Sequence, residues 1–487
     1  MKNTFSPINQ IPGGVLSLIP NYRDTDKELI VLTHVCRGWR ERFISCCSLW
    51  TSLDCTNVER THIYLDRAKT SPLEISLGEG DCAPFLNDAF LLTVPHLGRL
   101  NSLALSGSSD NLLQLVKYFG TPAPLLKKLN LTFTCTTTSV LQGKIFDGSL
   151  SSLRELRLSG VIADLAWGNM SSLKTFVLCQ IQGDKVSVTQ LLNFFERAPL
   201  LRKIRLEHAF PNSSDAPRGR VVSLPHLEFL TIVAQPAHTI LLNHLSIPAG
   251  AGLSQGFNFN DDKSPIPIYL PKTPNNLKSV SRITSINLSF NSGMSLRLNG
   301  PPSGTHYVQG GWVGESPSLP ILDRRVLQSL SLFGISAVER LAIAECKASS
   351  STKTEKSPVY LTLLSMNNLR TLTLTHCVNF PFILALNPGR NPSRTVVCPG
   401  LEELVLYTVS KASFCMKELL EMVKERASSG AKLSAVTIVC SQEFAPAKEV
   451  LKIREYVTRV EYRLDDVVPD WDILPTDADD TDYESDW

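Results

Sequence analysis

A short apolar pattern recurs along this chain from about residue 97 onward. Each copy consists of an apolar residue, two variable residues, a second apolar residue, one variable residue and a third apolar residue. The copies are Leu100/Leu103/Leu105, Leu126/Leu129/Leu131, Leu153/Leu156/Leu158, Leu173/Phe176/Leu178, Leu201/Ile204/Leu206, Leu227/Leu230/Ile232, Ile283/Ile286/Leu288, Leu327/Leu330/Leu332, Leu369/Leu372/Leu374, Leu401/Leu404/Leu406 and Leu433/Val436/Ile438, with a weaker one at Val457/Val460/Tyr462. Most early copies are about 26–28 residues apart, which is typical of stacked repeats.

The last two apolar residues of each copy are two positions apart, so they share one face of a β-strand. Helix-like stretches lie between copies, as at Asn111–Phe119, Val188–Ala198 and Met416–Ala427. Alternating strands and helices at this period predict the α/β fold class, as an irregular leucine-rich-repeat solenoid, or horseshoe, with parallel strands along its inner wall. A non-repetitive α/β domain is the alternative.

Three segments interrupt the repeat, near residues 255–276, 290–320 and 347–358. The first two are rich in Gly, Pro, Asn and Ser, and the third is polar. We expect them to be long loops that project from the repeats, or to be partly disordered.

The segment from Leu29 to Leu53 has a different periodicity. Apolar residues fall at spacings of three, four, three and four, at Leu29, Leu32, Cys36, Trp39 and Phe43. This spacing predicts one amphipathic α-helix, with arginines on its opposite side. By itself the pattern indicates only a buried helix face in an ordinary core.

The order of residues in this region resembles the F-box-like domain of fungal, basidiomycete-type proteins. The most characteristic stretches are His34-Val35-Cys36-Arg37-Gly38-Trp39-Arg40 and Ser48-Leu49-Trp50, followed by Tyr64-Leu65-Asp66-Arg67-Ala68. The resemblance covers about the first eighty residues. It implies an all-α F-box-like domain over residues 1–56, a leucine-rich-repeat-like solenoid over 57–464 and an acidic tail over 465–487.

The same resemblance implies a function. The chain would be the substrate-recognition subunit of an SCF-type cullin ubiquitin ligase, with a Skp-type adaptor and a cullin scaffold as partners and no catalysis of its own. The implied adaptor-binding residues are Ile11, Pro12, Val15, Leu16, Ile19, Leu29, Val35 and Trp50, with Trp39 inside the domain. An unknown target protein is expected on the inner wall, at Lys128, Asn130, Glu155, Arg157, Lys203, Arg205, Glu207, Thr371, Thr373, Glu403 and Tyr407.

A second interpretation comes from one departure from the family pattern. The family usually opens with Leu-Pro-x-Glu, whereas this chain has Ile11-Pro12-Gly13-Gly14. Two glycines weaken a helix by about 1 kcal/mol each relative to alanine. The alternative is a protein-interaction scaffold whose degenerate F-box acts as the cap of the solenoid.

Charge and composition exclude several other classes. Residues 465–487 hold ten acidic residues and no lysine or arginine, so a tail of charge −10 follows a body of about +12. We expect this tail to be solvated and disordered, and the alternative is that it folds back over the basic surface. Phosphate-binding loops, nucleophile elbows and zinc-ligand pairs are not found, so we expect neither an enzyme nor a cofactor. Lysines and arginines are not interleaved with aromatic residues, which disfavours nucleic acid. Without a signal peptide or a membrane-spanning run, a cytoplasmic or nuclear location is expected.

Overall fold

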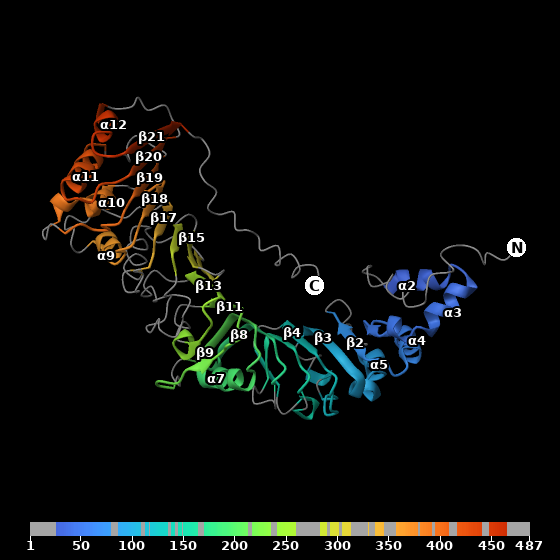
Figure 1. Ribbon diagram of the computed structural model, residues 1–487. Helices are drawn as coiled ribbons and strands as arrows, with labels where there is room; N and C mark the ends of the chain where they lie inside the picture. The colour runs from blue at the N-terminus through green and yellow to red at the C-terminus, as the bar shows by residue number, and fades with distance from the viewer. Residues whose placement is uncertain are drawn as a thin grey trace. The chain divides into compact units, whose positions relative to one another are not determined.

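The structure is a computed structural model of the 487-residue chain (Figure 1). It describes residues 26–78, 86–108, 113–115, 117–134, 138–141, 145–148, 150–163, 170–212, 217–234, 241–259, 283–289, 293–300, 304–312, 330, 337–344, 357–377, 380–391, 395–408, 416–440 and 448–464. The chain divides into two compact units, residues 1–218 and 219–487. Each unit is mixed α/β and contains parallel strands.

The described part of unit 1, from residue 26, starts with helices and continues into a sheet. Its elements are α2 (Asp26–Thr33), α3 (Arg37–Ser45), η3 (Cys47–Trp50), β1 (Ser52–Leu53), α4 (Val58–Ala68), β2 (Leu73–Leu77), α5 (Leu86–Leu91), η5 (Val94–Arg99), β3 (Leu100–Ser108), β4 (Lys128–Thr134), β5 (Ser139–Leu141), η6 (Ile145–Gly148), β6 (Glu155–Ser159), β7 (Val161–Ala163), β8 (Thr175–Ser187), α7 (Val188–Arg197) and β9 (Lys203–Asn212).

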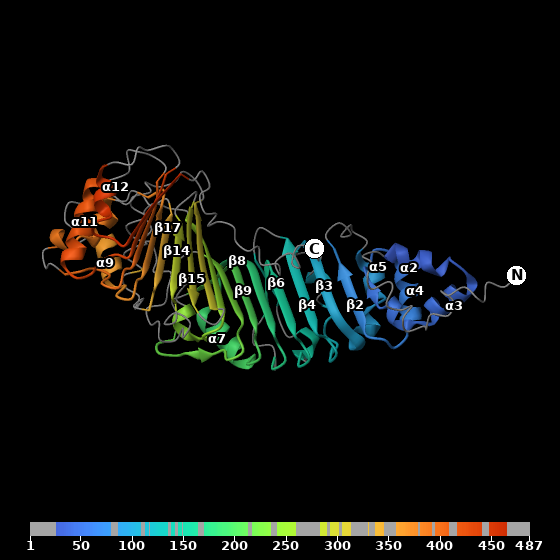
Figure 2. The same ribbon diagram turned by 45° about the horizontal axis from the view of Figure 1, so that its top comes forward.

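The main sheet of unit 1 is parallel throughout, in the order β1-β2-β3-β4-β6-β8-β9 (Figure 2). The second apolar residue of each repeat copy pairs with its equivalent on the next strand. These buried residues form a row through Leu53, Ile75, Leu103, Leu129, Leu156, Phe176 and Ile204, each at most 2% exposed. The strand prediction is therefore confirmed for these copies, because the spacing places both apolar residues on the core face.

Unit 2 contains β10 (Val222–Ser223), β11 (Phe229–Ala234), β12 (Leu245–Ser246), β13 (Gly252–Phe259), β14 (Ser285–Ser289), β15 (Gly293–Gly300), β16 (Gly304–Trp312), β17 (Arg340–Ala344), α9 (Pro358–Leu364), β18 (Thr371–Thr375), α10 (Phe380–Leu386), η11 (Pro388–Arg390), β19 (Glu403–Thr408), α11 (Met416–Ser428), β20 (Ala435–Cys440), α12 (Lys448–Ile453) and β21 (Arg459–Leu464). Its sheet order is β11-β13-β16-β15-β14-β17-β18-β19-β20-β21. Helices α9, α10 and α11 lie together on one side of strands β18–β20 (Figure 1).

Two sequence expectations differ from the structure of unit 2. Residues 255–259, 293–300 and 304–312, expected in loops, form the end of strand β13 and strands β15 and β16, and β15 pairs antiparallel with β14 and β16. The strand before β18 is β17, whose Val338/Leu341/Ile343 has the repeat spacing, rather than the Leu327/Leu330/Leu332 copy. Of that copy only Leu330 is described, and it is buried. Residues 260–276 and 347–356 lie outside the described ranges.

A buried arginine holds α11 against a neighbouring loop. Arg426 is 0% exposed, and its guanidinium donates to the carbonyls of Val397, at 2.8 Å, and Cys398, at 2.9 Å. Burial lowers the pKa of Arg426 and raises that of the Cys398 thiol to about 12. The helix prediction over Met416–Ala427 is confirmed, and so is the one over Val188–Ala198, where Ser187 and Gln190 form a capping box.

Candidate functional site

The predicted single helix from Leu29 to Phe43 is wrong, because the structure has two helices here. Helix α2 ends at Thr33 and α3 begins at Arg37. Cys36, between them, is extended and caps α3, with its Sγ accepting from the Trp39 N–H at 3.4 Å. Arg40 Nε donates to the Thr33 carbonyl at 3.0 Å and so satisfies the end of α2 from the next helix. Side-chain caps on both sides stabilise the break.

An aromatic cluster joins these helices to α4. Trp39 and Phe43 pack at 5.6 Å between ring centroids, and the Trp50 ring meets Tyr64 edge-on at 5.0 Å. Arg67 lies over the Trp50 ring, 4.2 Å from its centroid. Trp50 is 0% exposed, and its indole N–H donates to the Phe43 carbonyl at 2.9 Å. The cluster fixes α3, η3 and α4 relative to one another.

The outer side of the α2 region carries exposed aliphatic side chains. Val31 is 63% exposed, Val35 is 58% exposed and Ile30 is 38% exposed. Val31 and Val35 are four positions apart, and we call these three residues the α2 apolar strip. Val35 follows the end of α2 at Thr33, so the strip extends from α2 into the turn before α3, and an exposed apolar surface of this kind can serve as a protein-binding site.

The predicted adaptor-binding residues fall into three groups. Ile11, Pro12, Val15, Leu16 and Ile19 lie outside the described residues. Leu29, at 5% exposure, and Trp50 are interior, where they support the surface and do not form it. Val35 is exposed, and so are Ile30 and Val31, which the sequence reasoning did not name. Trp39 is buried at 6% exposure, as expected.

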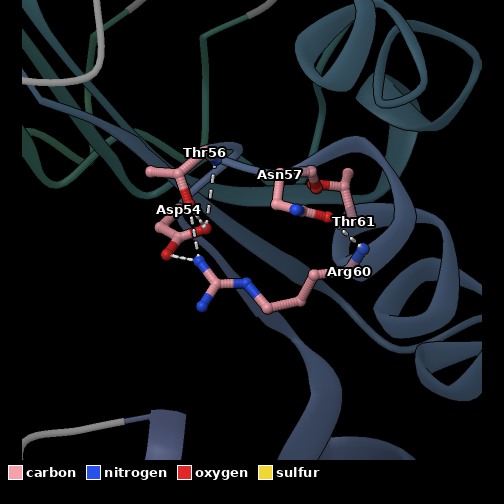
Figure 3. A network of polar contacts seen from close by, with 5 residues as sticks. All are labelled: Asp54, Thr56, Asn57, Arg60 and Thr61. Carbon is pink, nitrogen blue, oxygen red and sulfur yellow. Dashed lines mark hydrogen bonds and ion pairs between the residues drawn. The ribbon is translucent and has the colours of Figure 1, made fainter.

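A polar network ties the start of α4 to the end of β1 (Figure 3). Arg60 forms an ion pair with Asp54 and donates to the Thr56 hydroxyl at 2.7 Å. Asn57 caps α4 by accepting from the Arg60 backbone N–H at 2.9 Å, and its carbonyl accepts from the Thr61 hydroxyl at 2.8 Å. This cap lies on the expected boundary between residues 56 and 57, so the boundary does not separate two independent structures.

The predicted target-binding residues of unit 1 share the polar face of the sheet. Backbone pairing aligns Lys128, Glu155 and Lys203 in one row through β8, and Asn130, Arg157 and Arg205 in the next; Glu207 follows in the third row. Each of these seven residues is exposed or half-buried. The sheet register therefore brings them onto one surface.

Ion pairs within single strands organise the acids on this face. Arg157 pairs with Glu155 at 2.6 Å, and Arg205 pairs with Glu207 at 2.7 Å. Cys179 Sγ lies 3.9 Å from a Glu207 carboxylate oxygen, and burial, followed by the Glu207 charge, raises its thiol pKa to about 11. A thiol held protonated in this way is a poor nucleophile.

The sequence reasoning missed a further row of bases at the strand entries. Lys127, Arg154, Lys174 and Arg202 directly precede β4, β6, β8 and β9, and all four are exposed. The backbone N–H of each of the last three donates to the carbonyl of its predecessor in the row, at 2.8 Å. We call these residues the strand-entry row. Its sequence signal is a base directly after the first apolar residue of four consecutive copies.

The target-binding residues predicted in unit 2 also lie on a sheet face, but a less charged one. Thr371 pairs with Glu403 in one row and Thr375 with Tyr407 in another, with Thr373 between them on β18. All of the predicted residues here, Thr371, Thr373, Glu403 and Tyr407, are half-buried. Arg459 approaches Glu403 at 3.7 Å. The surface is polar and nearly neutral.

Other site types were sought in the described ranges. There, no group of three His, Cys, Asp or Glu side chains is placed to hold a metal ion. None of the helices described is both long and apolar enough to cross a membrane.

Comparison with known proteins gives no assignment: no protein-family model and no curated protein matches this chain. The α2 apolar strip and the polar sheet face are therefore the features from which a function can be argued.

Proposed function

We propose that this chain is the substrate-recognition subunit of an SCF-type cullin ubiquitin ligase. The observation that carries the proposal is the α2 apolar strip, in which Val31 and Val35 are 63% and 58% exposed beside the buried Leu29, Trp39 and Phe43 of the same helical segment. In the proposed complex a Skp-type adaptor covers the strip and connects the chain to the cullin scaffold. Burying apolar surface is the main source of affinity in such an interface.

The supporting structure beneath the strip favours a preformed binding surface. The Arg40–Thr33 contact fixes the end of α2 on α3, and the Trp50 indole fixes α3 through the Phe43 carbonyl. A surface held in its bound conformation loses less conformational entropy on association. We therefore propose that residues 26–50, with the His34–Arg40 and Ser48–Trp50 motifs, form an F-box-like helical segment.

The repeated part is proposed to be leucine-rich-repeat-like. Its support is the parallel register of consecutive strands, in which Leu103, Leu129 and Leu156 occupy equivalent buried positions. The target protein would bind the polar face of such strands. The chain would then act by positioning, since holding a target close to the ubiquitin-loaded partner raises its effective concentration.

Adaptor capture by the full chain tests the proposal. Val31→Asp/Val35→Asp places two carboxylates in the proposed interface. Each valine contributes about 1–2 kcal/mol when its exposed part is buried, so loss of both should lower adaptor affinity at least about 30-fold. Leu451→Asp, at 59% exposure in unit 2, is the matched control and should leave capture unchanged.

Two results would count against this role. One is a wild-type chain that fails to capture the adaptor at low salt, and the other is equal capture by the double variant and the wild type. Circular dichroism of both variants should match the wild type, because the replaced side chains are largely exposed.

A non-enzymatic interaction scaffold is the second candidate, and one observation favours it. Strand β1 pairs with β2 through Ser52–Glu74 and Leu53–Ile75, so the helical segment ends in a strand that covers the β2 edge. Sheet edges need such covers. A chain that binds its target but no adaptor would be this scaffold, with the helical segment acting only as a cap.

A further inference from the structure

We infer that the target segment recognised by unit 1 is acidic and extended, and that it binds across β4, β6, β8 and β9. This inference rests on the proposed function, since it names the class of partner for the same polar sheet face. The recognising groups are the strand-entry row, Lys127, Arg154, Lys174 and Arg202, together with the charged residues in the rows behind it.

The charge of this surface carries the inference. Four positions on each of the four strands are compared, none of them buried: the entry residue and the first, third and fifth residues of the strand pairing. These sixteen positions contain eight bases and two acids, a net charge of +6. Like charges on neighbouring strands repel one another, so this arrangement costs stability in the free protein. An acidic ligand relieves that repulsion on binding.

Unit 2 supplies an internal comparison at equivalent positions. Strands β17, β18, β19 and β20 are aligned by the same backbone pattern, and their entry residues are Glu339, Arg370, Glu402 and Ser434. Their sixteen positions contain two bases and three acids, a net charge of −1, and Arg370 pairs with Glu402 at 3.8 Å. Six of the unit 2 positions are buried, namely Ala342, Ala344, Thr375, Ala435, Thr437 and Val439, whereas none of the sixteen in unit 1 is, so the accessible basic surface belongs to unit 1.

The strand spacing sets the size of the segment. Neighbouring strands are about 4.8 Å apart, so the strand-entry row extends about 14 Å. An extended peptide advances about 3.3 Å per residue and crosses the row with about five residues. Two or three carboxylates within five residues would each meet a base.

Peptide is favoured over nucleic acid by the composition of the face. None of the sixteen positions in unit 1 is aromatic, so bases of a single strand have no stacking partners there. Glu155 and Glu207 lie within the face, each paired with an arginine. A phosphate backbone places a charge at every nucleotide and meets these acids, whereas a peptide can place neutral residues opposite them.

The test measures binding of labelled probes to the full chain by fluorescence anisotropy at about 50 mM salt. The first probe is a twelve-residue peptide in which Asp alternates with Ser, and its control has Asn in place of Asp. The third probe is a twelve-nucleotide oligothymidylate. We expect the Asp peptide to bind, the Asn peptide not to bind, and the oligonucleotide to bind more weakly than the Asp peptide. Added salt should weaken the Asp complex.

Two double variants, each replacing two lysines by glutamates, test whether the peptide binds at the strand-entry row. Lys127→Glu/Lys174→Glu should weaken the Asp peptide about tenfold or more, since two attractive contacts become repulsive. Lys424→Glu/Lys432→Glu, at exposed positions of unit 2, should change its affinity less than about twofold. Lys127→Arg/Lys174→Arg keeps the charge and should keep the affinity.

Three outcomes overturn the inference: equal binding of the Asp and Asn peptides, equal weakening by both charge-reversal pairs, or tighter binding of the oligonucleotide. Adaptor capture is measured on the same preparations. Retained capture with no peptide binding refutes the acidic target alone. If the wild-type chain binds the Asp peptide but does not capture the adaptor, the ligase role is refuted and a basic peptide-binding surface remains.

Discussion

Replacing Trp50 tests the packing that supports the α2 apolar strip. Its ring is fully buried, meets Tyr64 edge-on and donates one hydrogen bond to Phe43. The Phe43 carbonyl also accepts from the Cys46 N–H at 3.3 Å, so losing the indole leaves it one partner. The lost hydrogen bond therefore costs about 1 kcal/mol, not the larger penalty of an unsatisfied carbonyl.

The rest of the stability loss depends on the side chain that replaces the Trp50 indole. Trp50→Phe keeps most of the aromatic contact and loses volume worth about 1 kcal/mol, so the total is about 2 kcal/mol. Trp50→Ala removes the ring and should cost about 4–6 kcal/mol. Arg67→Met removes only the cation–π contact at 4.2 Å, worth about 0.5–1 kcal/mol.

Native-state hydrogen exchange measured by mass spectrometry reads out this local stability. In the peptide covering residues 37–50, Trp50→Phe should accelerate exchange about 30-fold and Arg67→Met about threefold, since 1.4 kcal/mol corresponds to a factor of ten. Strand β19 in unit 2 is the internal reference and should exchange at the wild-type rate. An acceleration below threefold in Trp50→Phe would refute the argument that this ring holds α3 in place.

Two further predictions concern the sheet units. Gly160→Ala should lower the free energy of unfolding, measured by urea titration, by more than about 2 kcal/mol. Gly160 has φ +66°, and an added Cβ would lie 2.1 Å from the Phe133 carbonyl oxygen. Gly430→Ala is the control: it has φ +79° but open space around it, so it should cost only about 1 kcal/mol. Burial raises the pKa of the Cys398 thiol in the folded chain to about 12, against 9.0 for an exposed thiol. As the pH rises, the unfolded chain therefore loses the thiol proton first. The stability that the protonated thiol contributes is complete below pH 9 and falls as the pH rises toward 12. Between pH 9 and 10 the wild type should therefore lose about 1 kcal/mol more than Cys398→Ala, and equal losses would contradict the assignment.

The strands were largely predictable because the apolar spacing of each repeat copy predicts both a strand and which of its faces is buried. Leu103 and Leu105, two positions apart, must point the same way, and their neighbours repeat the pattern. Strand β17 was missed although Val338/Leu341/Ile343 has the repeat spacing, because the nearby Leu327/Leu330/Leu332 has the same spacing and is richer in leucine. Pattern matching ranks apolar content, whereas strand pairing depends on register with β14 and β18.

Surface residues were harder to predict than strands. A helical period places Leu29 and Trp39 on one face, but it does not show that the helix breaks at Cys36 or that Arg40 caps the preceding turn. The burial of Trp50 depends on Tyr64 of α4, a contact that the local helical period does not show. Burial by distant elements decides which apolar residues are available to a partner.

The network of Asp54, Thr56 and Arg60 has a consequence for how this chain can be divided. A cut between residues 56 and 57 separates Asp54 from Arg60 and strips Tyr64 and Arg67 from the Trp50 ring. Neither fragment retains a complete core at the cut, so both should be insoluble or loosely folded when produced alone. The helical segment and the first strands of the sheet therefore form one cooperative folding block, and gene fusions or truncations that respect it must keep residues 26–77 together.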